Sequence, residues 1–153
     1  MFHVALFEPE IPPNTGNIMR LCANTGCQLH LIKPLGFRLD DKQLRRAGLD
    51  YREFADVALY DSLDELLAKL GSVNVWALTT HGQRRHADAE FTAGDLLLFG
   101  PETRGLPKDL LTRLENRCLR IPMRSESRSL NLSNAAAVVI YEAFRQLDFP
   151  DLN

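Results

Sequence analysis

The 153-residue sequence has little of what marks secreted, membrane-spanning or metal-binding proteins. Its three cysteines, Cys22, Cys27 and Cys118, form no C-x-x-C pair, which favours buried thiols in a reducing compartment over disulfides or a zinc site. No apolar run approaches the roughly 20 residues that a membrane span needs. The chain opens on a strand-like stretch, residues 2–7, without a charged lead or a cleavage site. We therefore expect no signal peptide, no membrane association and a cytoplasmic location.

An excess of positive charge is also missing. The formal net charge is −2, so bulk attraction would not hold nucleic acid, and any RNA binding must use local patches. Basic residues cluster at three places, each equally typical of a solvated face: Arg45-Arg46 with Arg52, Arg84-Arg85-His86, and Arg124 with Arg128. The sequence has neither a G-x-G-x-x-G fingerprint nor a P-loop lysine motif. His81 and His86 lack a third ligand, so we expect no metal.

Apolar runs alternate with amphipathic stretches along the whole chain. Strands are predicted at 2–7, 28–33, 57–60, 73–79, 95–99 and 118–121, and several are apolar on both faces, as buried parallel strands are. Helices are predicted at 15–25 after the cap Asn14, at 41–47 after Asp40, at 63–70 after a Ser62/Glu65 capping box, at 108–114 after Pro107 and at 131–147. We expect one domain, residues 1–153, with a doubly wound parallel α/β sheet that carries helices on both faces.

Two long loops, residues 80–94 and 122–130, contain little pattern of helix or strand. Both follow predicted strands, so they belong to the carboxyl edge of the sheet, where open α/β sheets bind ligands. Three stretches near that edge carry polar residues suited to chemistry.

The first stretch is PEIPPNTGNIMRLCANTG, residues 9–26. Prolines stiffen a loop that feeds a helix N-terminus, where Asn14 and its neighbours could bind an anion such as phosphate. Asn17, Arg20 and Asn24 share one helix face. A capped amphipathic helix with a solvated Arg20 explains the same pattern. Glu8 and Glu10 are too isolated to form an acid–base pair.

The second stretch is LLLFGPETRGLP, residues 96–107. Gly100 ends a buried strand and could allow close backbone approach of a ligand, with Glu102 at the lip of the sheet. A plain turn with Gly105 in the left-handed conformation remains the alternative.

The third stretch is RIPMRSESRSLNLSNAAA, residues 120–137. Apolar backbone flanked by Ser129 and Asn131 could line a pocket for a purine and its sugar. Alternatively, Asn131 or Ser133 is only the N-cap of the last helix.

Together these stretches resemble, in order and spacing, the three motifs of the SPOUT methyltransferase superfamily. Over residues 2–150 the chain is most similar to its tRNA wobble-nucleotide (cytidine/uridine) 2′-O-methyltransferase branch. The resemblance implies a deep trefoil knot in the C-terminal part of the sheet and a homodimer joined by the first and last helices. It also implies a tRNA substrate and bent S-adenosyl-L-methionine held by Leu78, Gly100, Glu102, Ile121, Met123, Ser129 and Leu130.

By the same resemblance, Arg20 lies at the reacting ribose hydroxyl with Asn14 beside it, and Ser129 and Asn131 complete the catalytic site. Because a guanidinium has a pKa above roughly 12, we expect Arg20 to clamp phosphate and stabilise an alkoxide rather than to act as a base. RNA contacts fall on Arg20, Arg124, Arg128 and Tyr141. His81 stands where close relatives carry lysine. Two alternatives remain open: the same chemistry on ribosomal RNA, and a catalytically silent RNA-binding module.

Overall fold

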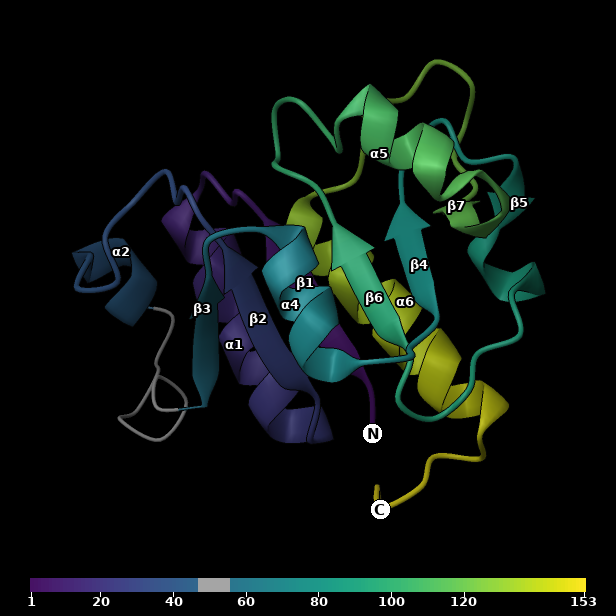
Figure 1. Ribbon diagram of the computed structural model, residues 1–153, viewed down its shortest axis with the longest axis horizontal. Helices are drawn as coiled ribbons and strands as arrows, with labels where there is room; N and C mark the ends of the chain where they lie inside the picture. The colour runs from purple at the N-terminus through teal and green to yellow at the C-terminus, as the bar shows by residue number, and fades with distance from the viewer. Residues whose placement is uncertain (47–55) are drawn as a thin grey trace.

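A parallel β-sheet runs through the molecule (Figure 1). The structure is a computed structural model that describes residues 1–46 and 56–153. Within these residues the sheet has seven strands in the order β3-β2-β1-β6-β4-β7-β5, and every neighbouring pair is parallel. The strands are β1 (His3–Phe7), β2 (Gln28–Ile32), β3 (Val57–Tyr60), β4 (Val75–Leu78), β5 (Arg84–Arg85), β6 (Leu96–Phe99) and β7 (Cys118–Arg120).

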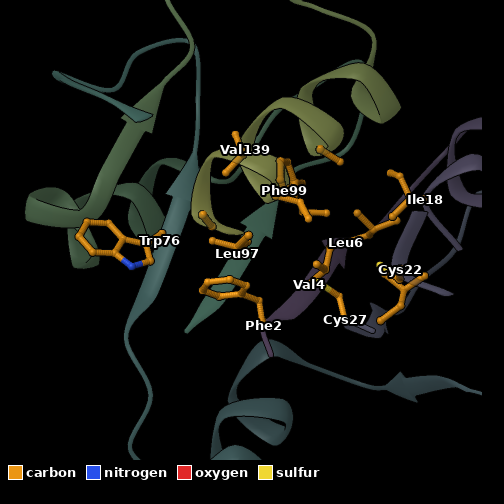
Figure 2. Close-up of a cluster of buried hydrophobic side chains, with 14 of the residues drawn as sticks. Phe2, Val4, Leu6, Ile18, Cys22, Cys27, Trp76, Leu97, Phe99 and Val139 are labelled. Atoms are coloured by element: carbon orange, nitrogen blue, oxygen red, sulfur yellow. The ribbon is translucent and has the colours of Figure 1, made fainter. Parts of the chain in front are cut away.

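Helices cover both faces of the sheet, as the pattern of doubly apolar strands predicted. The helices are α1 (Pro12–Thr25), α2 (Lys42–Arg45), α4 (Leu63–Leu70), α5 (Lys108–Arg113) and α6 (Leu132–Gln146). Along β6, Leu97 and Phe99 pack into the core layer under α1 and α6, whereas Leu96 and Leu98 pack into the layer under α4 and α5. Figure 2 shows the first of these layers, where Ile18 of α1 and Val139 of α6 enclose the side chains of β1 and β6.

The start of α1 differs from the prediction. The helix begins at Pro12 with Ile11 at the N-cap position, so Asn14 is a buried residue of the first turn and not the cap. Proline is well suited to the first helical turn, because its fixed φ is helical and its missing N–H has no partner there anyway. The predicted end is confirmed, since Gly26 adopts the left-handed conformation with φ 74°.

Other helix boundaries mostly follow their predicted caps. The carboxylate of Asp41, not that of Asp40, accepts the N–H groups of Gln43 and Leu44, and α2 is correspondingly short. The predicted end at Ala47, like Arg52 in the first basic patch, lies outside the described residues. Ser62 caps α4 as predicted, and Asn131 caps α6.

The loop between β4 and β6 also contains more structure than predicted. Arg84 and Arg85 form the short strand β5 beside β7, followed by a 3-10 turn over His86–Asp88. Two adjacent arginines carry no apolar signal, so only their pairing with β7 makes them a strand. In the described part of the chain, no helix has both the length and the apolar character required to cross a membrane.

A polar group is buried among the strands β1 to β3. His30 is 4% exposed, its Nε2 lies 3.0 Å from Nδ1 of His3, and its ring lies 5.5 Å from that of Tyr60. Burial, together with the nearby charges of His3 and Lys69, lowers the pKa of His30 from 6.5 to about 4. The native protein therefore holds this imidazole in its neutral form near neutral pH.

We expect the free energy of unfolding to fall as the pH falls from about 6.5 to about 4, by roughly 3 kcal/mol in total from His30. The sign follows because the unfolded chain, with the higher pKa, binds the proton more tightly in that range. Urea titrations followed by the fluorescence of Trp76 measure it. The variant His30→Gln should lose most of this slope, whereas His81→Gln, at an exposed position, should retain it. Equal slopes in the two variants would contradict the assignment.

Candidate active site

A cavity of about 470 Å³ opens at the carboxyl edge of the sheet, where β4, β6 and β7 end. It is formed by the segments that follow these strands, together with the first turn of α1 and the start of α6. All seven residues predicted to hold a cofactor line it: Leu78, Gly100, Glu102, Ile121, Met123, Ser129 and Leu130. The structure thus brings the three sequence motifs to one site.

A chain of side-chain hydrogen bonds joins the three motifs at this cavity. The Glu102 carboxylate accepts the backbone N–H groups of Glu10 at 2.8 Å and Ile11 at 3.1 Å, and the amide of Asn14 at 3.4 Å. Asn14 Oδ1 in turn accepts the side-chain amide of Asn131 at 2.9 Å. Two of the four predicted catalytic residues are therefore in direct contact and oriented by Glu102.

Asn131 serves both of the roles that the sequence left open. Its Oδ1 accepts the N–H groups of Ser133 and Asn134, which makes it the N-cap of α6. Its Nδ2 is held by Asn14, and the residue lines the cavity. The cap therefore fixes the position of an amide that faces the site. Ser129 also lines the cavity, on the exposed loop before α6.

A second set of contacts joins the Gly100–Leu106 loop to the segment that precedes α1. The Glu10 carboxylate accepts the Thr103 N–H at 2.9 Å and the Thr103 hydroxyl at 2.8 Å, and Arg104 pairs with Glu8 at 3.2 Å. The hydrogen bonds from Thr103, with the nearby charge of Arg104, lower the pKa of Glu10. Glu8 and Glu10, set aside as isolated acids in the sequence, thus have partners about 95 residues away that no local pattern reveals.

Close backbone contact explains Gly100. A Cβ there would lie 2.5 Å from the backbone nitrogen of Leu106, so the glycine lets the loop fold back on itself beside the cavity. Gly105 has a φ of +66°, as the turn interpretation predicted. The chain, rather than a ligand, fills the space that Gly100 leaves open.

The predicted RNA contacts lie elsewhere. Arg20 is exposed on α1, six residues and about 9 Å along the axis from Asn14, and it does not line the cavity. Arg124 and Arg128 are exposed on the 122–131 loop, and Tyr141 is 45% exposed on α6. One copy of the chain therefore does not assemble all the proposed catalytic and RNA-binding residues at the cavity.

Some cavity residues were missed by sequence analysis. Thr79 and Thr80 line it beside His81, as does Ile11. Their position directly after β4, at the carboxyl edge, is the one signal that would have found the two threonines. Among residues 1–46 and 56–153, no group of three or more His, Cys, Asp or Glu side chains could hold a metal.

Comparison with known proteins defines the class. Residues 1–141 match the SpoU rRNA Methylase family, so the chain belongs to this family. It is 60% identical, over 98% of its length and 96% of the relative's, to a tRNA (cytidine(34)-2′-O)-methyltransferase of Yersinia pestis. A protein of the same name from Saccharophagus degradans is 57% identical, over 97% of both chains.

Solved structures agree with this classification. One solved structure, described as giving structural insights into the 2-OH methylation of C/U34 on tRNA, is 48% identical to this chain. The two superimpose with a TM-score of 0.90 over 97% of both chains. The SpoU methyltransferase AviRb of Streptomyces viridochromogenes, in complex with AdoMet, is 28% identical. Its TM-score is 0.82, over 95% of this chain and 57% of that one. The predicted family resemblance is confirmed.

Replacing Glu102 by Ala should lower the free energy of unfolding by about 2 kcal/mol, because two backbone N–H groups and the Asn14 amide lose their acceptor. Urea denaturation measures the change. Glu126→Ala, in an exposed loop, is the matched control and should shift stability by less than about 0.5 kcal/mol. Similar effects at both positions would show that Glu102 does not hold the motifs together.

Proposed function

We propose that this chain is a single-domain methyltransferase that transfers a methyl group from S-adenosyl-L-methionine to the ribose 2′-hydroxyl of the wobble pyrimidine in tRNA. The observation that carries the proposal is the convergence of the three motifs on one cavity, linked through Glu102, Asn14 and Asn131. It is supported by relatives at 57–60% identity that bear the name of this activity and that match nearly the full chain. A tRNA substrate favours the cytoplasm as the place of action.

The cavity fits the cofactor in size and chemistry. Its volume of about 470 Å³ lies in the range of small-molecule sites, and Leu78, Ile121 and Met123 offer apolar surface for a purine. The Glu102 carboxylate at its rim is complementary to a cationic ligand. The solved relative that contains AdoMet supports the same assignment. We also propose that the cofactor binds without a metal, as the resemblance to the three motifs implies.

S-adenosyl-L-methionine, when bound, supplies a methyl group on a cationic sulfur. The chain's own residues must align the ribose oxygen for in-line attack and stabilise the charge that develops as its proton leaves. Asn14 and Asn131 are held rigidly enough to orient the ribose, with Ser129 beside them. Because the guanidinium group is a hydrogen-bond donor that matches phosphate oxygens, the role of Arg20 is to stabilise the oxygen and hold the adjacent phosphate.

We propose that the active form is a homodimer. α6 leaves the apolar side chain of Val138 41% exposed, which suits contact with a second copy. Because Arg20 lies outside its own cavity, the partner's Arg20 would complete the site across the interface. Arg124, Arg128 and Tyr141 would then contact the tRNA around the shared site.

We also propose the deep trefoil knot. The chain leaves β7 and lines the cavity at Ile121, Met123 and residues 129–131. It then continues into α6, which packs beside α1 in the core layer against β1 and β6. On this proposal, the C-terminal segment passes between the loops that follow β4 and β6. The superposition on the SpoU methyltransferase AviRb supports a shared overall fold.

Two other functions remain as outcomes of experiment. The family description names ribosomal RNA, which keeps that substrate as an alternative. A silent RNA-binding module is less favoured, because Asn14, Ser129 and Asn131 all line the cavity.

Incubation with unfractionated tRNA and labelled cofactor should place one methyl group on the ribose of the wobble pyrimidine, because an anticodon loop presents splayed bases to a small protein. Mass spectrometry of the nucleosides and mapping of the label measure this. Calorimetry in chelator should show cofactor binding in parallel. Label found only in ribosomal RNA, or on a base, would refute the substrate, and binding without transfer would favour the silent module.

Arg20→Ala should abolish transfer while cofactor binding persists, because Arg20 does not line the cavity. If the partner's Arg20 acts, co-expressed Arg20→Ala and Ser129→Ala chains should regain about a quarter of wild-type activity, since half of the dimers then contain one intact site. Each variant alone should stay inactive. No recovery in mixed dimers, or a sedimentation mass of one chain, would contradict the shared site.

A further inference from the structure

Four arginines belong to β5, to β7 and to the 3-10 turn that precedes β7: Arg84, Arg85, Arg117 and Arg120. Arg85 lies directly opposite Arg120 in the strand pairing. The guanidinium groups of Arg84 and Arg117 both lie over the ring of Trp76, 5.6 and 5.0 Å from its centroid. Like charges held this close repel one another, so the arrangement needs an explanation.

Nearby carboxylates do not balance this charge. Asp88 makes two hydrogen bonds with Arg85, at 2.7 and 3.0 Å. The bond from Arg85, assisted by the charges of Arg84 and Arg120, lowers the pKa of Asp88, so several guanidinium groups surround one carboxylate. Across the described ranges 1–46 and 56–153, Arg84, Arg117 and Arg120 form no ion pair with a carboxylate.

Two further acids lie in this region without cancelling the excess. Glu115 begins the turn that contains Arg117, and its charge acts on the thiol of Cys118. Glu142 forms an ion pair with Arg145 at 2.8 Å, and the charge of His86 acts on it more weakly. Three guanidinium groups, those of Arg84, Arg85 and Arg120, thus act on one carboxylate, Asp88, which is already bonded to Arg85.

The basic edge is continuous with the rim of the cavity. The Arg120 side chain donates hydrogen bonds to the carbonyl oxygens of Gly82, at 3.2 Å, and Gln83. A Cβ at Gly82 would lie 2.5 Å from the carbonyl carbon of Leu119, so this segment is pressed against β7. The preceding residues Thr80 and His81 line the cavity. Figure 1 shows β7 and β5 next to β4, on the side away from β6 and near the carboxyl ends of β4 and β6.

We propose that Arg84, Arg85, Arg117 and Arg120 form a docking surface for the phosphodiester backbone of tRNA, on the stretch that leads away from the nucleotide in the cavity. The inference rests on the proposed function and extends it to a surface. A chain with net charge −2 can attract RNA only through such a local excess. Guanidinium forks match phosphate oxygens, and stacking on Trp76 holds two of them in place in advance.

The test is the affinity of labelled, unfractionated tRNA at several salt concentrations, measured by fluorescence anisotropy. Arg85→Gln and Arg117→Gln should each weaken binding about fivefold to tenfold near 0.1 M salt and reduce the slope of log K against log salt by about 1. Asp88→Asn, which removes the one carboxylate in the cluster, should tighten binding. Arg38→Gln, whose side chain is 87% exposed and paired with Asp40, is the control and should match the wild type.

Thermal unfolding followed by Trp76 fluorescence checks that each variant folds. If Arg117→Gln does not fold, Arg85→Gln decides the matter, since its side chain is 57% exposed. The docking surface would be overturned if Arg85→Gln and Asp88→Asn bound tRNA with the same affinity as the Arg38→Gln control. If the wild type still methylated tRNA, the proposed function would stand. A wild type with no affinity for tRNA would contradict both.

Discussion

The hydrogen bonds that connect Glu102, Asn14 and Asn131 are the constraint on which the site depends. They join a loop after β6, the first turn of α1 and the cap of α6, three segments that are remote in sequence. The parallel sheet brings these segments to one edge, but only the side chains fix their relative positions. Two of the three residues also have a second role, because Glu102 accepts backbone N–H groups just before α1 and Asn131 is the N-cap of α6. The hydrogen bonds that shape the site therefore also hold the helices in place.

Sequence patterns predicted the fold where burial dictates residue choice. Strands such as β4 and β6 are apolar on both faces because helices cover both sides, and this signal needs no knowledge of partners. The same reasoning predicts the start of α1 three residues too late, because Asn14 has the residue type of a cap but bonds to Asn131 instead. A polar residue near a helix start can cap the helix or bond to a residue far away in the sequence, and the sequence alone does not distinguish these two roles.

Long-range polar contacts were beyond prediction for a physical reason. Glu10 and Thr103 are ordinary surface residue types, and their pairing depends on loops that meet only when the sheet has formed. The motif resemblance predicted the seven cofactor residues that line the cavity and placed Arg20 outside the cofactor pocket, but it did not predict the lining by Ile11, Thr79 and Thr80. Similarly, the sequence left open whether Arg84 and Arg85 form an RNA-binding patch or a solvated face, and it could not show that the pairing with β7 places Arg85 opposite Arg120.

The small size of β5 also affects how the molecule behaves among its own copies. A sheet that ends on an open strand offers unpaired backbone groups to which further strands can add without limit. Here the outermost strand on this side is two residues long, and both residues are arginines. If β5 of a second copy approached this edge, two residues would offer too few backbone hydrogen bonds for pairing. The arginines of the two copies would also repel each other. The terminal strand thus acts as a stop against open-ended fibre growth, at no expense to the apolar layers behind it.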